Sequence, residues 1–150
     1  MDSVIIRAAC STDLTEILAL YKVLLDEEIQ IEKASHTFDR ICASDDTFIF
    51  VAEIEGAVVG TIQISLSLGM GFDCRPFATV EYLVVNEAYR RNGIGHSLLN
   101  QVDIIAEKYN CAFVYLVSSA IHKEAHKLYY SAGFDENVIG FRKAYSEVVV

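Results

Sequence analysis

The residues best placed to do chemistry lie at positions 85–95, where two adjacent arginines precede two glycines. An apolar run typical of a strand comes before them, and a pattern typical of an amphipathic helix follows. The first turn of a helix leaves four backbone N–H groups unpaired, and the helix dipole adds roughly half a positive charge there. We therefore expect this turn to bind a phosphate group on backbone amides, which it can approach closely where glycine has no Cβ. The expected binding residues are Arg90, Arg91, Asn92, Gly93, Ile94, Gly95 and His96.

The standard nucleotide motifs do not describe this turn. Gly93-Ile94-Gly95 lacks the third glycine of the dinucleotide fingerprint, and the chain contains no Gly-Lys-Ser or Gly-Lys-Thr. Arg90 and Arg91 would add charge-assisted contacts to a phosphate, although two arginines can also form a merely solvated surface. The strand before the turn and the helix after it favour the phosphate site.

The elements expected around this turn form one α/β domain over residues 1–150. Periodicity predicts helices over residues 11–28, 37–43, 93–109 and 123–132. Strands are expected over residues 4–8, 48–52, 58–68, 77–85 and 113–117, with one or two more around 138–147. We expect strand 77–85 to be buried on both faces and strand 113–117 to lie in the middle of a covered sheet. This order predicts a mixed sheet, whose antiparallel half leads into a β-α-β unit that carries the glycine turn.

Composition and charge narrow the function classes. Hydrophobic residues make up 53% of the 150, and no run approaches the roughly 18 apolar residues of a membrane span. The N-terminus shows no secretory signal, and the four cysteines have no Cys-x-x-Cys spacing, which favours reduced, buried thiols in a cytoplasmic protein. The formal net charge of −9 disfavours nucleic-acid binding and favours cationic partners. No metal site is expected, because His122 and His126 do not form His-Glu-x-x-His.

Two segments of the sequence resemble the GNAT superfamily of acetyl-CoA-dependent N-acetyltransferases. In the first, Arg90-x-x-Gly93-x-Gly95 is similar to the family's cofactor motif, Gln/Arg-x-x-Gly-x-Gly/Ala. In the second, residues 125–134 are similar to Ala-x-x-Leu/Phe-Tyr-x-x-x-Gly-Phe. One departure is His122, which stands where the family often has an asparagine that contacts the cofactor arm.

The resemblance implies a fold, an activity and a co-substrate. The fold would be a mixed, mostly antiparallel central sheet with helices on both faces. The activity would be transfer of the acetyl group of acetyl-CoA to a primary amine, by direct attack in a ternary complex and without a metal. Strand 81–85 would separate from its neighbour at a bulge, so that backbone groups of Leu83, Val84 and Val85 bind the pantetheine arm. The alternative is a non-catalytic domain that binds or senses acetyl-CoA.

Glu81 and Tyr129 are the expected catalytic residues. An amine attacks only when neutral, and Glu81 is a carboxylate in an otherwise apolar strand, expected on the same side as Leu83 and Val85. It would act as general base directly or through a water; the alternative is an edge-exposed or arginine-paired glutamate. The resemblance places Tyr129 near the thioester sulfur, as hydrogen-bond donor or general acid, with core packing as its alternative. A phenol of pKa ~10 is a weaker acid than a thiol of ~8.5, which favours stabilisation of the thiolate over full proton transfer.

The acceptor amine is not defined by these motifs. Its walls are expected at residues 29–36, at residues 68–76 and at the last strand, which are variable parts of such a fold. The acidic balance suggests a cationic small amine, an aminoglycoside-like compound or a basic peptide terminus. A homodimer fits the habit of the family, and the apolar tail Val148-Val149-Val150 could finish an edge strand or pack on a second subunit.

Overall fold

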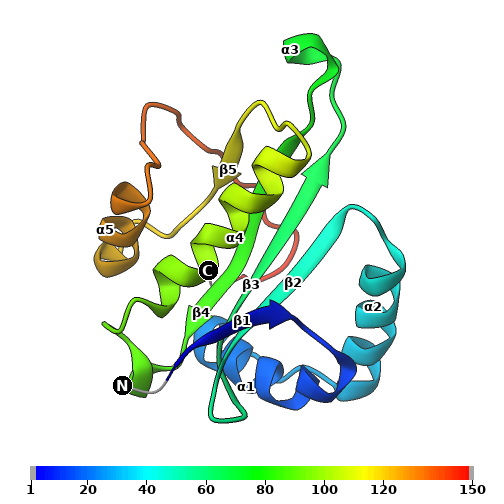
Figure 1. The fold of residues 1–150 in the computed structure, drawn as a ribbon, viewed down its shortest axis with the longest axis vertical. Coiled ribbons are helices and arrows are strands. Elements are labelled where there is room, and N and C mark those ends of the chain that lie inside the picture. The colour runs from blue at the N-terminus through cyan, green and yellow to red at the C-terminus, as the bar shows by residue number, and fades with distance from the viewer. Residues whose placement is uncertain (1–2, 149–150) are drawn as a thin grey trace.

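A five-stranded sheet with the order β1-β2-β3-β4-β5 runs through the chain (Figure 1). The computed structural model describes residues 3–148. The strands are β1 (Ile5–Ala8), β2 (Thr47–Ile54), β3 (Ala57–Ser67), β4 (Phe77–Val85) and β5 (Val114–Leu116). Neighbouring strands are antiparallel except for β4 and β5, which are parallel. The mixed, mostly antiparallel sheet and the β-α-β unit at its end are therefore confirmed.

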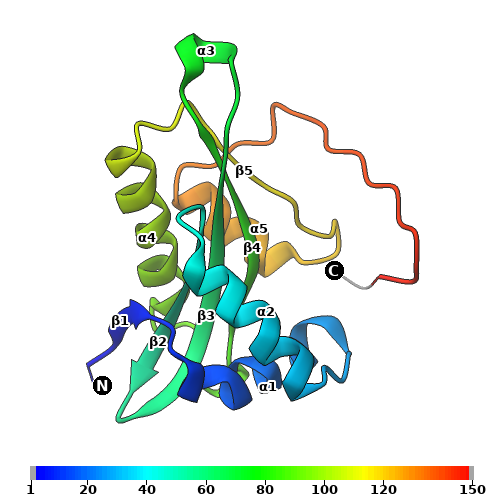
Figure 2. The same ribbon diagram turned by 90° about the vertical axis from the view of Figure 1, so that its right-hand side faces the viewer.

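Helices cover both faces of this sheet (Figures 1 and 2). Helices α1 (Leu14–Leu25) and α2 (Ile31–Ala43) lie on one side, which we call the α1 face. Helix α4 (Ile94–Lys108) crosses the opposite side, the α4 face, with α5 (Lys123–Ser131) beside it. The short turns η1 (Ser11–Asp13), α3 (Gly71–Cys74) and η2 (Glu87–Tyr89) complete the fold.

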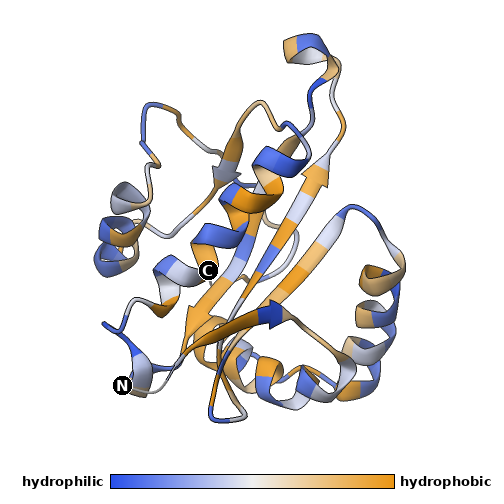
Figure 3. Cartoon of the chain, in the orientation of Figure 1, coloured by the Kyte–Doolittle hydropathy of each residue, from blue (hydrophilic) through white to orange (hydrophobic). Residues whose placement is uncertain are grey.

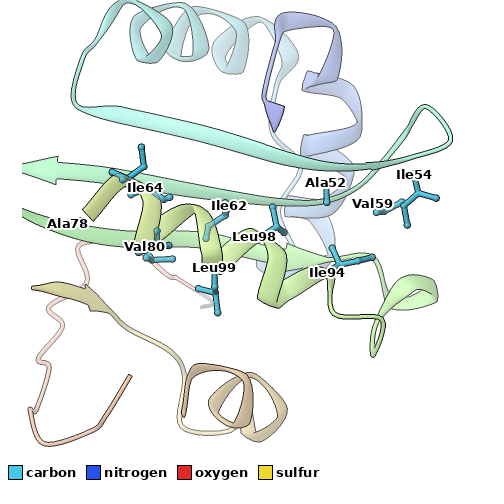
Figure 4. Close-up of a cluster of buried hydrophobic side chains, with 12 residues drawn as sticks. Ala52, Ile54, Val59, Ile62, Ile64, Ala78, Val80, Ile94, Leu98 and Leu99 are labelled. Carbon is cyan, nitrogen blue, oxygen red and sulfur yellow. The ribbon is translucent and has the colours of Figure 1, made fainter. Parts of the chain in front are cut away.

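The main core lies between the sheet and α4 (Figure 4). Alternate residues of β3 and β4 point into it, as the two-residue period of a strand requires. Hydrophobic residues concentrate on the strands and on the helix sides that face them (Figure 3). The members of this cluster with the least exposure are Ala52, Ile62, Ile64, Ala78, Ile94, Leu98 and Val102. A second cluster under α1 contains Ile17, Leu20, Val51, Val58 and Val84.

The helices agree with their predicted positions, apart from their ends. The helix predicted over residues 37–43 begins six residues earlier, at Ile31. Its N-terminal half carries polar residues that no buried stripe requires, which hid it from the periodicity argument. Ahead of α1, the Asp13 carboxylate accepts the Cys10 N–H at 2.8 Å and makes no cap bond to α1 itself. Residues 68–76, expected to line the acceptor site, contain the turn α3.

The C-terminal part of the chain differs from the prediction. Residues 138–147 contain no strand; they form an extended tail that arches away on the α1 face (Figure 2). Strand β5 therefore has β4 as its partner on one side and, within residues 3–148, no strand on the other. The expectation that it lies in the middle of a covered sheet was wrong, because an apolar run reports burial of side chains and not pairing of both backbone edges. Of the apolar tail Val148-Val149-Val150, only Val148 is described, and it is exposed; the expectation for Val149 and Val150 lies outside the described residues.

Two further expectations concern the burial of the cysteines and the presence of membrane-spanning helices. Cys10, Cys42 and Cys74 are free but exposed, and Cys111 is half-buried, so the expectation of buried thiols was wrong. These small side chains sit at loop and helix ends, where neighbouring residues do not cover them. Within the described chain, no helix has the length and apolar character needed to cross a bilayer.

Candidate active site

A β-bulge interrupts strand β4 at its middle. Glu81 pairs with Gln63 of β3 and Val84 pairs with Thr61, so that Tyr82 and Leu83 together oppose the single residue Ile62. Tyr82 has a left-handed backbone with φ of 51°, which is uncommon for a residue with a large side chain. Its ring lies 5.1 Å from that of Tyr21 on α1, and this aromatic contact holds the bulge against the helix. The bulge expected in this segment is present.

The extra residue of the bulge reverses which face the later side chains occupy. Before it, Val80 belongs to the core under α4, so Glu81 points to the α1 face. After it, Leu83 and Val85 pack against the core under α4, while Val84 packs under α1. Glu81 therefore lies on the opposite side from Leu83 and Val85, and the sequence prediction that they share a side was wrong. Simple alternation fails here because an inserted residue shifts the period by one.

Beyond the bulge, β4 loses its neighbour on one side. The pairing of β4 with β5 ends at Val80 and Leu116, so within residues 3–148 Glu81 to Val85 have no strand partner on that edge. Asn86 donates its N–H to the Val59 carbonyl of β3, so the Val85 carbonyl at the other end of this peptide points to the open edge. There it accepts a hydrogen bond from Arg90 Nε at 3.1 Å. The structure thus supplies an open strand edge of the kind to which an extended ligand can add.

The turn that follows β4 contains a row of backbone N–H groups without a protein acceptor. Among residues 3–148, no protein acceptor receives the amides of residues 91–96, and the first helical bond runs from the Ser97 N–H to the Gly93 carbonyl at 3.0 Å. Arg91 and Gly93 both have left-handed backbones, with φ of 65° and 77°. Left-handed residues in such a turn can point successive amides into one concave site. This geometry fits a diphosphate at the N-terminus of α4.

The two glycines of the turn serve different purposes. Gly93 needs a left-handed backbone, which a side chain disfavours, and a Cβ there would meet no atom within 4 Å. Gly95 lies inside α4, and its Cβ would lie 2.8 Å from Leu128 Cδ2 on α5. The structure therefore gives Gly95 a packing reason, the close approach of α4 and α5, which the sequence argument did not consider.

Polar side chains of the loop itself and of α5 stabilise this turn through hydrogen bonds. Asn92 Nδ2 donates to the Tyr89 carbonyl at 3.1 Å. The ring of His96 makes a 2.8 Å hydrogen bond between its Nε2 and Ser131 Oγ on α5. Arg90 is turned back onto β4, whereas Arg91 is exposed. Of the two arginines, Arg91 has the side chain that is free to approach a phosphate without breaking a described hydrogen bond.

Glu81 is more exposed than the sequence suggested. Glu81 and Tyr82 are exposed positions of β4. The expectations of a buried carboxylate and of a strand buried on both faces were therefore wrong. Even so, partial desolvation against its neighbours raises the pKa of Glu81 above its ordinary value. A carboxylate with a raised pKa is a stronger base, and its exposure leaves room for a water or an amine beside it.

Tyr129 lies on the other side of the sheet. Its half-buried ring packs against the core under α4 and lies 6.2 Å from the ring of Phe134. Burial raises the pKa of Tyr129, and an interaction with the side chain of Ser118 partly opposes that effect. Glu81 and Tyr129 thus lie on opposite faces of the sheet, while the amides of residues 91–96 lie beyond the end of β4.

The aromatic pair Tyr21 and Tyr82, which shapes this site, was not predicted from the sequence. Neither Tyr21 nor Tyr82 was among the expected site residues. No local signal marks Tyr82, because the left-handed backbone arises where α1, β3 and β4 meet. The hint in the sequence was the run Glu81-Tyr82-Leu83, which breaks the alternation of side chains along β4.

Comparisons with known proteins agree with this geometry. The sequence model of the acetyltransferase (GNAT) family matches residues 13–134. This range contains the bulge, the amide turn and both catalytic candidates. The chain therefore belongs to the GNAT family and is an acetyl-CoA-dependent N-acetyltransferase.

Solved structures place the fold in the same family. A proposed acetyltransferase from Agrobacterium tumefaciens str. C58 is 31% identical, with 93% of this chain and 99% of that chain covered and a TM-score of 0.87. Glucosamine-6-phosphate N-acetyltransferase from Arabidopsis thaliana is 21% identical, with 97% and 100% covered and a TM-score of 0.85. An aminoglycoside N-acetyltransferase AAC(6')-Iy in complex with CoA is 22% identical, with 95% and 96% covered and a TM-score of 0.79. A search among curated proteins found no significant match.

Proposed function

We propose that this chain transfers the acetyl group of acetyl-CoA to a primary amine by direct attack, with both substrates bound at once. The observation that carries the proposal is the row of unpaired amides at residues 91–96, which suits the diphosphate of acetyl-CoA. From there the pantetheine arm would follow the open edge of β4 past Val85, Val84 and Leu83 toward the bulge. Val84 pairs with Thr61 of β3, so we expect it to help position Leu83 and Val85 and not to bind the pantetheine arm itself.

The reaction needs one proton removed and one negative charge stabilised. Glu81, on the α1 face, takes the proton of the amine, directly or through a water, so that the nitrogen lone pair can attack the thioester carbon. The new C–N bond forms as the C–S bond breaks, and the electron pair leaves on sulfur. Tyr129, on the other face, donates a hydrogen bond to this thiolate. Because burial raises the pKa of Tyr129 above that of an ordinary phenol, complete proton transfer becomes still less favourable, and stabilisation by a hydrogen bond is the role we assign.

The acceptor class follows from charge. The net charge of −9 and the carboxylate at the bulge favour an amine that arrives as a cation. Small cationic amines, aminoglycoside-like compounds and basic peptide termini all satisfy this requirement. The aminoglycoside enzyme found among the similar structures is 22% identical and does not single out its substrate for this chain.

An acetylation screen tests the proposal. The purified chain is incubated with acetyl-CoA and a broad library of primary amines, and free CoA thiol is measured together with the mass of the product. Initial rates with the best amine should give intersecting double-reciprocal lines, as a ternary complex requires, and not the parallel lines of a ping-pong mechanism. Tight binding of acetyl-CoA without acetylation of any amine would contradict the proposed reaction.

A further inference from the structure

Four aromatic rings gather on the α1 face, on the part of the sheet that α1 and α2 leave uncovered. Phe77 of β4 stacks on Phe113 at 5.0 Å, and Phe113 lies 4.5 Å from Tyr115 of β5. Phe72 of the α3 turn meets Phe113 edge-on at 5.6 Å. We call these four residues the aromatic shelf. None of them belongs to either buried cluster of the core.

The shelf is exposed in a way that packing does not explain. Tyr115 is 47% exposed and Phe72 is 68% exposed. A contiguous exposed apolar patch on a protein of this size commonly marks a binding surface. Phe72, Asp73 and Cys74 in addition hold left-handed backbones, with φ of 55°, 60° and 61°. Each such conformation costs about 1–2 kcal/mol for a residue with a side chain, so the turn that carries Phe72 onto the shelf is maintained against local strain.

The shelf shares its face with Glu81. Phe77, Thr79 and Glu81 are alternate residues of β4 before the bulge, so their side chains point to the same side. Thr79 pairs directly with Tyr115 of β5. With about 3.3 Å per residue along a strand and about 4.8 Å between strands, the Cα atoms of Glu81 and Tyr115 lie about 8 Å apart. A ring bound on Tyr115 would thus hold an amine, one to three carbons away, near the Glu81 carboxylate.

The charge of the strands around Glu81 favours a ligand with a single cationic group. The carboxylates in strands β2 to β5 are Glu53 and Glu81. Glu53 accepts a 2.7 Å hydrogen bond from Arg7 Nε and is therefore already ion-paired. The neighbours of Glu81 on this face, Gln63 and Thr79, are neutral. A polyamine or an aminoglycoside would bring several cations to one carboxylate and would leave the aromatic rings without an apolar partner.

We propose that the acceptor is a primary amine that carries an aromatic ring, and that this ring stacks on the shelf beside Tyr115. The inference rests on the proposed acetyltransfer at Glu81 and adds the substrate class. Aromatic rings prefer offset-stacked or edge-to-face contact, and both arrangements already occur within the shelf. Tyr115 and Phe72 are the exposed members and determine specificity. Phe77 and Phe113 are less exposed, and their rings hold the other two in place.

The test compares phenethylamine, n-butylamine and spermidine by initial rates of CoA thiol release at saturating acetyl-CoA. The measured quantity is the ratio of kcat/KM for phenethylamine to that for n-butylamine. Within one protein preparation, this ratio cancels any loss of active enzyme. We expect a ratio of at least ten for the unmodified chain, with spermidine below phenethylamine. A ratio near one, or spermidine as the best of the three, would overturn the inference while leaving acetyltransfer itself intact.

Three variants locate the effect on the shelf. Tyr115→Ala should lower the ratio about fivefold to tenfold, mainly through the KM for phenethylamine, whereas Tyr115→Phe, which keeps the ring, should preserve it. Phe72→Ala removes an exposed side chain at the tip of α3, so the fold should tolerate it, and it should lower the ratio about threefold. Equal losses for both amines in Tyr115→Ala and Phe72→Ala would contradict the shelf as an acceptor site. Failure of every amine in the library to yield CoA would overturn the proposed function together with this inference.

Discussion

At the scale of single residues, the site depends on how its environment shifts two ionisable groups. Glu81 lies beside the bulge with a raised pKa, and Tyr129 lies across the sheet, also with a raised pKa. Both shifts have the same leading cause, which is the loss of water around the charged form. Their consequences differ, because a raised pKa makes a carboxylate a better base and a phenol a poorer acid.

Replacement of Glu81 by glutamine should remove the general base while keeping the shape of the side chain. We expect kcat to fall about 10²-fold or more near neutral pH, as is typical for loss of general-base catalysis. In the unmodified enzyme, kcat/KM should decline as the pH falls through the raised pKa of Glu81, because the protonated carboxyl cannot accept a proton. Glu81→Gln should lack this acidic limb. Glu107→Gln, an exposed position on α4, is the matched control, and equal activity of the two variants would refute the role of Glu81.

Tyr129→Phe should affect the step that releases the thiolate. If Tyr129 only donates a hydrogen bond, as the raised pKa suggests, kcat should fall about 10-fold, with little change in the affinity for acetyl-CoA. The basic limb of the pH profile should stay where it is, since no proton of Tyr129 is transferred. Stopped-flow measurement of CoA release over a range of pH checks both points. Loss of a basic limb in the variant would instead establish Tyr129 as a general acid.

At the scale of elements, glycine variants can separate the effect of backbone strain from the effect on ligand binding at the N-terminus of α4. Gly93→Ala places a Cβ on a residue with φ of 77° and should cost about 1 kcal/mol of stability. It should also shift the concave row of amides and weaken acetyl-CoA binding at least tenfold by calorimetry. Gly56→Ala, in the β2–β3 turn with φ of 81° and no atom within 4 Å of its Cβ, should cost similar stability without weakening binding. Equal affinity in the two variants would rule out the proposed turn.

A second element-scale prediction concerns the ion-pair cluster that ties β1 to η1 and β2. Arg7 contacts the buried Asp13 carboxylate at 2.7 and 2.9 Å, and Glu53 at 2.7 Å. These bonds, with Arg7 as the main cause, lower the pKa of Asp13 from 3.8 to about 2. A lowered pKa means that the folded state favours the charged form, so the resulting stability is present above pH 3.8. It is lost as the pH falls toward 2.

Chemical denaturation between pH 2 and 6 measures this contribution. The shift corresponds to about 2 kcal/mol of unfolding free energy. Asp13→Asn should therefore be less stable than the unmodified chain at pH 6, and the difference should shrink toward pH 2. Asp103→Asn, at an exposed position of α4, serves as the control and should show neither effect. A difference that stays constant over this pH range would contradict the assignment to the Asp13 carboxylate.

At the scale of the whole molecule, the tail and the free edge of β5 point to self-association. Phe141 is 95% exposed, and Ile139 and Tyr145 are 81% and 90% exposed, on a segment that packs against little of its own chain. Strand β5 has an open edge in the part of the chain that the structure describes. An apolar extended segment and an open strand edge are complementary, so we expect a dimer in which the tail covers an edge of the partner.

Sedimentation velocity over a range of concentrations tests this expectation. The chain should sediment as a dimer at micromolar concentration, and Phe141→Ser should shift it toward the monomer. Val23→Ser, which changes an exposed apolar residue on α1, should leave the sedimentation coefficient unchanged. A monomer at all concentrations would contradict the association.

Much of this protein could be predicted from its sequence, because the relevant signals are local. Strand β4 was predicted with its observed ends, and the turn of residues 91–96 was predicted from glycine, arginine and helix periodicity alone. Backbone amides at a helix N-terminus lack an intrahelical partner for geometric reasons that hold in any fold, so this feature did not depend on distant residues.

The features that required the tertiary structure all depend on contacts between distant segments. The bulge at Tyr82 arises where α1, β3 and β4 meet, and it moved Glu81 to the opposite face from Leu83 and Val85. The packing role of Gly95 depends on Leu128 of α5, and the aromatic shelf gathers residues from α3, β4 and β5. The sequence by itself predicted the class of fold and the turn of free amides, which follow from short-range periodicity and backbone geometry, and its resemblance to a known family supplied Tyr129 as a candidate residue. Only the tertiary structure decided which face each side chain occupies, because one inserted residue in a strand reverses every position that follows it.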